Sequence, residues 1–267
     1  MMLEKITILG GKDKDGIPEK IQRLDVRAGE VLAVVGPTGS GKSQLIADVE
    51  QYVEEETLTG RSVLIDDQPA DKNDNKGLSR YLVAQVSQNM NFVIDMSMEE
   101  FLLMHAEVRA IKNPRQTIKD VLSITNELSG EPVSLSVNLT QLSGGQSRAL
   151  MVADVALISN SPVVLIDEIE NAGIDRLQAL QILTGQGKIV LVVSHDPTLI
   201  LLAGKRVIMK NGGMHKVLVT TPEEENISKD LIKIDKKFAH LREQLRNGNS
   251  IGAEKLKKEE FTAWPKF

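Results

Sequence analysis

Apolar residues along the chain fall into short continuous runs, separated by longer segments in which they recur at helical spacing. The runs at Val31–Val35, Val163–Ile166 and Ile189–Val193 are rich in β-branched residues, which predicts strands buried on both faces of a sheet. A helical pattern follows the first run as far as about Glu56. Strands that alternate with helices indicate an α/β fold around a mostly parallel sheet.

Shorter strands are predicted at both ends of this core. Apolar positions near Ile6–Ile8 and Ile21–Val26 flank a polar, glycine-containing loop from Gly10 to Pro18, which predicts an N-terminal antiparallel β flap. Two more short strands are expected, at Ser62–Ile65 and Tyr81–Val86, and a closing hairpin turns at Asn211-Gly212-Gly213.

The middle of the chain is predicted to be helical. Ser97 and Glu100 have the spacing of a capping box that opens one helix, and Asn113-Pro114 ends it. A second helix is expected to stop at Gly130, because glycine readily adopts the left-handed conformation of a helix end. We therefore expect a helical subdomain over about residues 89–160.

The tail, residues 221–267, is predicted to be a separate amphipathic helix followed by a polar end, after one domain over residues 1–220. Thr221 is the expected N-cap of this helix. Its apolar residues repeat at spacings of four and three, a narrow seam typical of helix pairing: Ile227, Leu231, Ile234, Phe238, Leu241 and Leu245. The seam fits a second subunit or the surface of its own domain.

Composition narrows the possible functions. The 267 residues include no cysteine, so disulfides, thiolate metal sites and cysteine nucleophiles are excluded. No run of about 18 apolar residues exists, so no membrane span is expected. The net charge of −5, without a long basic run, does not indicate nucleic-acid binding. These features suit a cytoplasmic protein, or one peripheral to the inner face of a membrane through a partner.

The segment that joins the first buried strand to its helix fits the phosphate-binding pattern G-x-x-x-x-G-K-[ST]. It consists of Gly36, Pro37, Thr38, Gly39, Ser40, Gly41, Lys42 and Ser43. Its glycines allow the backbone to approach phosphate oxygens, and the N–H groups of the helix start face the anion. Lys42 is expected to reach the β- and γ-phosphates, and the Ser43 hydroxyl to ligate Mg²⁺.

Polar residues also end the other two buried strands. Asp167 and Glu168 follow one, and Ser194-His195 follow the other. Ligands of open α/β sheets bind outside the carboxyl ends of the strands, so these groups can converge on one nucleotide. Asp167 suits a carboxylate that holds Mg²⁺, and Glu168 suits one that orients an attacking water.

A second anion-binding helix start is predicted at Leu142–Gln146, where a serine and two glycines precede a helix. With this segment, the order of motifs resembles that of ABC-type ATPases, the ATP-binding cassette family. Gly36–Ser43 resembles the Walker A loop, Gln88 the Q-loop glutamine and Leu142–Gln146 the family signature. Val163–Asp167 resembles Walker B, followed by the catalytic glutamate, Glu168, and later by the switch histidine, His195.

The resemblance implies a P-loop NTPase fold and hydrolysis of ATP with Mg²⁺ by a head-to-tail dimer. Glu168, His195 and Gln88 would act in catalysis, and Ser43, Gln88 and Asp167 would hold the metal. The nucleotide would lie between the phosphate-binding loop of one copy and four signature residues of the other: Ser143, Gly144, Gly145 and Gln146.

The chain departs from the family pattern in three places, one of which is the segment Ser147-Arg148-Ala149 after the signature, where a Gln-Arg pair is frequent. No aromatic residue precedes Tyr52, so the tyrosine that usually stacks on adenine is missing from the loop Gly10–Pro18, where Ile17 is an aliphatic substitute. The proline that often follows the catalytic glutamate in transporter members is also missing, since Ile169 occupies that position.

Three functions are consistent with this pattern. The first is the ATPase subunit of a membrane transporter, with a permease as its partner. The second is a soluble, non-transport ABC ATPase that remodels or reactivates a protein partner, or acts in nucleic-acid maintenance. The third is a regulator with little hydrolysis, against which the presence of both Glu168 and His195 argues.

Overall fold

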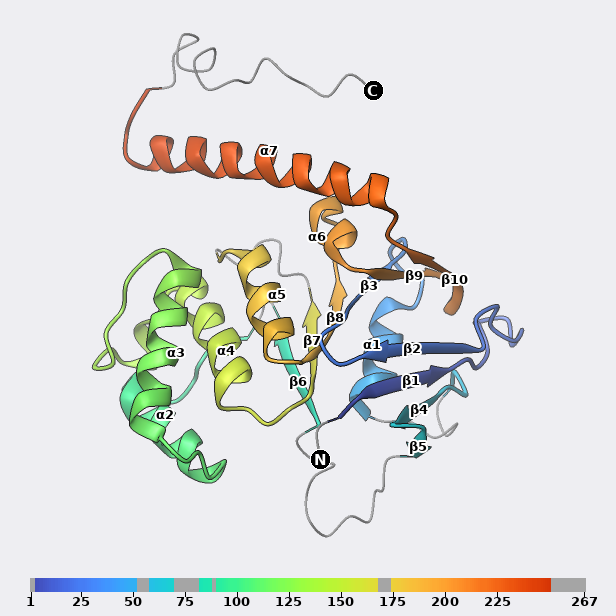
Figure 1. Cartoon of the computed structure of the whole chain (residues 1–267), viewed down its shortest axis with the longest axis horizontal. Helices are drawn as coiled ribbons and strands as arrows, with labels where there is room; N and C mark the ends of the chain where they lie inside the picture. The colour runs from blue at the N-terminus through green and yellow to red at the C-terminus, as the bar shows by residue number, and fades with distance from the viewer. Residues whose placement is uncertain (1–2, 52–57, 70–81, 88–89, 168–173, 251–267) are drawn as a thin grey trace. The chain divides into compact units, whose positions relative to one another are not determined.

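The computed structural model describes residues 3–51, 58–69, 82–87, 90–167 and 174–250 (Figure 1). The chain divides into two compact units, Met1–Thr220 and Thr221–Phe267. Among the described residues, the first holds two β-sheets and every helix except the last.

A mostly parallel sheet forms the centre of the first unit, as predicted. In the described residues it has six strands in the order β10-β9-β3-β8-β7-β6. Only the pairing of β10 with β9 is antiparallel. The strands are β3 (Val31–Val35), β6 (Val83–Ser87), β7 (Val163–Asp167), β8 (Ile189–Val193), β9 (Lys205–Lys210) and β10 (Gly213–Val219).

The predicted antiparallel flap is a second sheet in the order β2-β1-β4-β5. Its strands are β1 (Lys5–Leu9), β2 (Arg23–Arg27), β4 (Ser62–Ile65) and β5 (Gln68–Pro69). The Thr7 hydroxyl donates to Asp25 Oδ1 at 2.6 Å across β1 and β2, and this bond holds the pKa of Asp25 below its usual value. The strand predicted at Ser62–Ile65 thus belongs to the flap.

Both faces of the six-stranded sheet are covered, which explains its continuous apolar runs. Leu32 and Val34 face a core shared with helix α1 (Lys42–Gln51) and the antiparallel sheet. Ala33, between them, faces the opposite core. That core is shared with α4 (Gly144–Leu157), α5 (Arg176–Gly185) and α6 (Pro197–Leu202).

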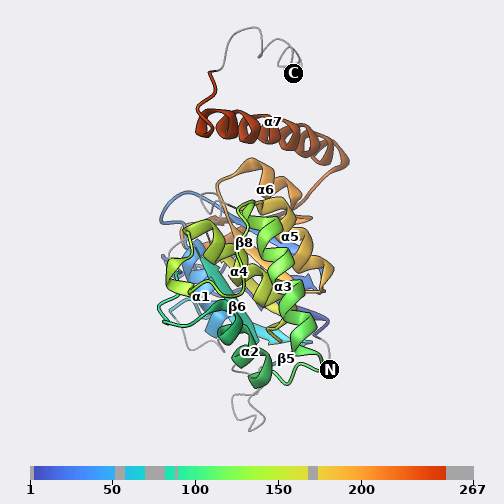
Figure 2. The same cartoon turned by 90° about the vertical axis from the view of Figure 1, so that its left-hand side faces the viewer.

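The helical subdomain has an apolar core of its own, built by α2 (Met98–Val108), α3 (Pro114–Ser129) and α4 (Figure 2). The predicted capping box is present, since Ser97 Oγ accepts from the Glu100 N–H and Glu100 Oε2 accepts from the Ser97 N–H. Gly130 ends α3 in the left-handed conformation with φ of 66°, also as predicted.

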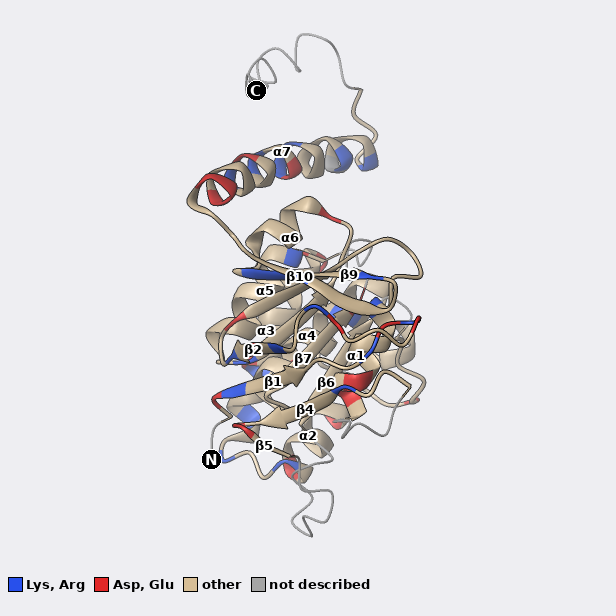
Figure 3. Ribbon diagram, turned by 90° about the vertical axis from the view of Figure 1, so that its right-hand side faces the viewer, with Lys and Arg blue, Asp and Glu red and all other residues tan. Residues whose placement is uncertain are grey.

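The second unit contains helix α7 (Pro222–Arg246), with side chains of both charges along its length (Figure 3). Thr221 caps it as predicted, because Thr221 Oγ1 accepts from the Glu224 N–H and Glu224 Oε2 accepts from the Thr221 N–H. None of the helices in the described ranges combines the length and apolarity that crossing a membrane requires.

One predicted boundary differs from the structure, and another is not tested. Helix α1 is described as far as Gln51, and the predicted helix end near Glu56 lies outside the described residues. Strand β6 spans Val83–Ser87, so the predicted range Tyr81–Val86 began and ended too early in the sequence. Element ends are set by hydrogen bonds that apolar patterns do not report.

Removing the buried side chain of Leu191 tests the central strand. Leu191 on β8 is fully buried, so Leu191→Ala should lower the free energy of unfolding by about 2–5 kcal/mol. Val219→Ala, on an edge strand and 66% exposed, is the control and should cost under about 1 kcal/mol. Urea denaturation followed by circular dichroism measures both, and equal losses would contradict this core.

Candidate functional site

The phosphate-binding loop, Gly36–Ser43, joins β3 to α1, as its sequence predicted. Gly41 has a φ of 99°, and a Cβ atom there would lie 2.7 Å from the Gly212 Cα, so only glycine fits. No acidic residue occupies the first turn of α1. The helix itself therefore adds no carboxylate at its positive end, which suits an anion.

Lys42 is the first residue of α1. Its Nζ donates to the Gly36 carbonyl at 2.7 Å and to the Pro37 carbonyl at 3.2 Å. Ser40 Oγ is buried and has no hydrogen-bond partner among the described residues. Among the described residues the amine therefore pairs with carbonyls alone and the buried hydroxyl has no partner, and both features fit a loop that accepts phosphate oxygens.

Strand register brings the predicted site residues to one edge of the sheet. Val193 at the end of β8 pairs with Val34 of β3 on one side and with Asp167 of β7 on the other. Asp167 in turn pairs with Ser87, the last residue of β6. The phosphate-binding loop, the segment Ser194-His195 and Asp167 therefore all lie at the carboxyl edge. Gln88 and Glu168, which follow β6 and β7 in sequence, lie outside the described residues.

The segment that carries His195 is held on both sides. Ser194 is buried, and its Oγ accepts from the Asp196 N–H at 2.9 Å. Asp196 caps α6 by accepting from the Thr198 N–H at 2.8 Å, and it accepts from Arg176 Nη1 at 2.6 Å. His195 itself is exposed. A fixed backbone and an exposed imidazole suit a residue that contacts a ligand at this edge.

The signature segment opens α4 and is not brought to the phosphate-binding loop of the same chain. Ser143 is the N-cap, with its Oγ 3.2 Å from the Gln146 N–H, and Gln146 Oε1 accepts from the Ser143 N–H at 2.9 Å. Since α1 and α4 pack against opposite faces of the sheet, the two anion-binding helix starts are separated within one chain.

Gln146 has a structural role that sequence analysis missed. Its side chain completes the capping box of α4, a role distinct from the nucleotide contact predicted for it. The spacing S-x-x-Q at 143–146 was a visible signal of this cap, because it repeats the pattern recognised at Ser97 and Glu100.

Comparison with known proteins agrees with this arrangement. The family model described as "ABC transporter" matches residues 20–171. An uncharacterized ABC transporter ATP-binding protein of Methanocaldococcus jannaschii is 48% identical over 96% of this chain and 98% of its own length. The macrolide export ATP-binding/permease protein MacB of Campylobacter jejuni is 29% identical over 79% of this chain, which spans only 33% of MacB.

A solved structure has the same fold. An ATP-binding cassette, solved as a dimer in a post-hydrolysis state with ADP and Pi, superposes with a TM-score of 0.59. The match covers 81% of this chain and 99% of the cassette at 20% identity, so it shows the fold alone. The family model and the archaeal relative show more: this chain belongs to the ABC transporter family, as one of its ATP-binding proteins.

Proposed function

We propose that the chain binds ATP with Mg²⁺ and hydrolyses it as the ATPase subunit of a membrane transporter. The observation that carries this proposal is the strand register. It places the phosphate-binding loop with Lys42, the carboxylate of Asp167 and the exposed His195 at one edge of the sheet. Groups that bind phosphate, hold a metal and contact a terminal phosphate are the ones that phosphoryl transfer needs.

Each residue has a role in the proposed reaction. The Lys42 amine exchanges its two carbonyl partners for phosphate oxygens, which stabilises charge on the transferred group. Glu168 orients and polarises the attacking water, while His195 contacts the γ-phosphate and Gln88 senses the metal. Electrostatic stabilisation by fixed donors supplies most of the acceleration in reactions of this class.

The oxygen donors fit Mg²⁺, which prefers one or two carboxylates together with phosphate and water oxygens. Ser43 would supply a hydroxyl and Asp167 a carboxylate, and Gln88 would complete the set. The metal, when bound, neutralises charge on the β- and γ-phosphates.

We propose that two copies share each nucleotide. Within one chain the signature helix start, Ser143–Gln146, is separated by the sheet from the phosphate-binding loop. A second copy in head-to-tail orientation would supply Ser143, Gly144 and Gly145 to the γ-phosphate, with Gln146 holding the helix start in shape. The solved dimer of a related cassette with ADP and Pi supports this arrangement.

We propose a membrane permease as the partner, which would place the chain at the cytoplasmic face of a membrane. MacB, a relative, is named as an ATP-binding and permease protein in one chain. Apolar side chains exposed around α2 suit a protein contact there. They are Met90, Val93, Ile94, Met104 and Val108, of which Val93 is 89% exposed.

Lys42→Ala tests nucleotide binding. Losing the amine should weaken ATP binding by at least about 100-fold, because a cationic donor to the phosphates is lost. Isothermal titration calorimetry measures this, and Lys20→Ala, at an exposed lysine after the flap loop, is a control that should bind ATP like wild type. Tight ATP binding by Lys42→Ala would count against the assigned site.

Ser143→Ala tests the signature segment, and Ser97→Ala is a matched control. Ser143 caps α4 and Ser97 caps α2, each through a capping box of the same type. Each substitution should therefore lower the free energy of unfolding by about 1 kcal/mol. Only Ser143→Ala should lower steady-state ATP hydrolysis, by about tenfold or more, through loss of a phosphate contact. Equal hydrolysis by the two variants would remove Ser143 from the site.

Glu168→Gln tests the water-orienting role and the dimer together. Hydrolysis should fall by at least about 100-fold, since the amide cannot act as a base. Light scattering with ATP and Mg²⁺ should then show a doubled mass, while the neighbouring Glu170→Gln behaves as wild type. If Glu168→Gln hydrolyses ATP at the wild-type rate, the role belongs to another residue.

A further inference from the structure

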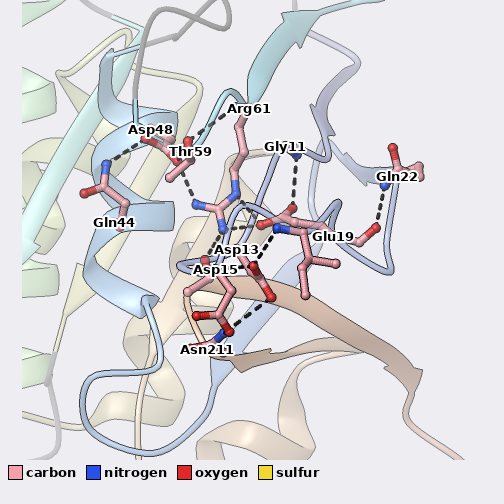
Figure 4. A network of polar contacts seen from close by, with 12 residues as sticks. Gly11, Asp13, Asp15, Glu19, Gln22, Gln44, Asp48, Thr59, Arg61 and Asn211 are labelled. Atoms are coloured by element: carbon pink, nitrogen blue, oxygen red, sulfur yellow. Dashed lines mark hydrogen bonds and ion pairs between the residues drawn. The ribbon is translucent and has the colours of Figure 1, made fainter.

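A fully buried arginine outside the motifs joins four segments near the phosphate-binding loop (Figure 4). Arg61, at the entry of β4, is 0% exposed. Its Nε donates to Glu19 Oε1 at 3.0 Å, and Nη2 donates to the same oxygen. Its Nη1 donates to Asp48 Oδ2 at 2.7 Å, and Nη2 also donates to the Gly212 carbonyl at 2.7 Å. We call these four residues the Arg61 cluster.

The members of the cluster come from distant parts of the sequence. Glu19 follows the loop of the N-terminal flap, Asp48 lies on α1, and Gly212 lies in the turn between β9 and β10. Two more donors hold the Asp48 carboxylate, Thr59 Oγ1 at 3.0 Å and Gln44 Nε2 at 2.9 Å. Moving Glu19 or Asp48 away from Arg61 would leave a buried carboxylate without its ion partner, and moving Gly212 would remove an acceptor from Nη2. The cluster therefore keeps these segments in one arrangement.

The turn held by Arg61 contacts the phosphate-binding loop directly. The Gly212 N–H donates to the Ser40 carbonyl at 2.8 Å. Gly212 has a φ of 87° and lies so close to Gly41 that no side chain fits between them. Arg61 therefore holds the carbonyl of Gly212 while the N–H of the same residue holds the loop.

Lys14 makes a second contact with the phosphate-binding loop. Its Nζ donates to the Gly39 carbonyl at 2.7 Å, and its backbone N–H donates to the Asn211 carbonyl at 2.9 Å. Asn211 Nδ2 in turn donates to Asp15 Oδ2 at 2.7 Å. The flap loop and the turn thus hold two successive carbonyls of the phosphate-binding loop, those of Gly39 and Ser40.

Fixing these carbonyls also fixes two N–H groups. In a planar trans peptide the C=O and the following N–H point in opposite directions. Holding the Ser40 carbonyl therefore turns the Gly41 N–H the opposite way, available to a phosphate oxygen as in other loops of this pattern. Holding the Gly39 carbonyl fixes the Ser40 N–H, which donates to the Pro37 carbonyl at 3.1 Å and closes the turn at the tip of the loop.

We propose that Arg61 and Lys14 are positioning residues for the nucleotide, acting through the backbone of the phosphate-binding loop. The proposal rests on the proposed function only in that a nucleotide binds at this loop. The N–H groups of such loops cradle the phosphates nearest the sugar, which ATP and ADP share. Loss of either positioning residue therefore weakens ATP and ADP equally and leaves kcat at saturating ATP nearly unchanged.

Arg61→Lys and Lys14→Met test the proposal. Arg61→Lys keeps the buried positive charge but loses the planar fork that reaches three partners at once. Lys14→Met removes one exposed amine, and Lys12→Met, an exposed lysine of the same loop, is the matched control. Calorimetry measures the Kd of ATP and of ADP, steady-state assays give kcat, and thermal melts compare Tm with and without ADP.

The expected result is a rise of about tenfold in both Kd values for Arg61→Lys and Lys14→Met, with kcat within about twofold. The increase in Tm caused by ADP should shrink in the same variants and stay normal in Lys12→Met. If Arg61→Lys fails to fold, Lys14→Met decides alone. A lower Tm with unchanged Kd values, or weaker binding of ATP alone, overturns the proposal. Wild-type chain that binds neither nucleotide would instead overturn the proposed function.

Discussion

The structure depends above all on the parallel pairing of β3 with β8 and of β8 with β7. These strands are apolar on both faces because α1 and the antiparallel sheet cover one face and α4, α5 and α6 cover the other. Register then has little freedom, since a slip of one residue would exchange the side chains that face the two cores. The same register places Lys42, Asp167 and His195 at one edge of the sheet.

The phosphate-binding loop is also held by residues outside the six-stranded sheet. The Arg61 cluster lies among the flap, α1 and the turn after β9, and its charges are withdrawn from water. A buried ion cluster of this kind contributes little net stability, because desolvation offsets the attraction between its charges. Its effect is geometric, since it restricts the segments around the loop to one arrangement.

The sequence could point to most of the candidate site because its signals are local. The pattern Gly36–Ser43, the strand ends at Asp167 and Ser194, and the capping box at Ser97 each involve residues close in sequence. Gln146 shows what a motif cannot predict. The signature pattern includes this residue, but it does not tell whether the side chain caps the helix or contacts a ligand. Arg61 gave no signal, because its partners, such as Glu19 and Gly212, are distant in sequence and meet only in the folded chain.

A structure of the wild-type chain with Mg²⁺ and a non-hydrolysable ATP analogue tests the central claim most directly. We expect the Lys42 amine to leave the Gly36 carbonyl for the phosphates, with Asp167 next to the metal and Ser143 of a second copy against the terminal phosphate. A nucleotide bound away from the carboxyl edge of β3, β8 and β7, or one not contacted by any second copy, would contradict the account.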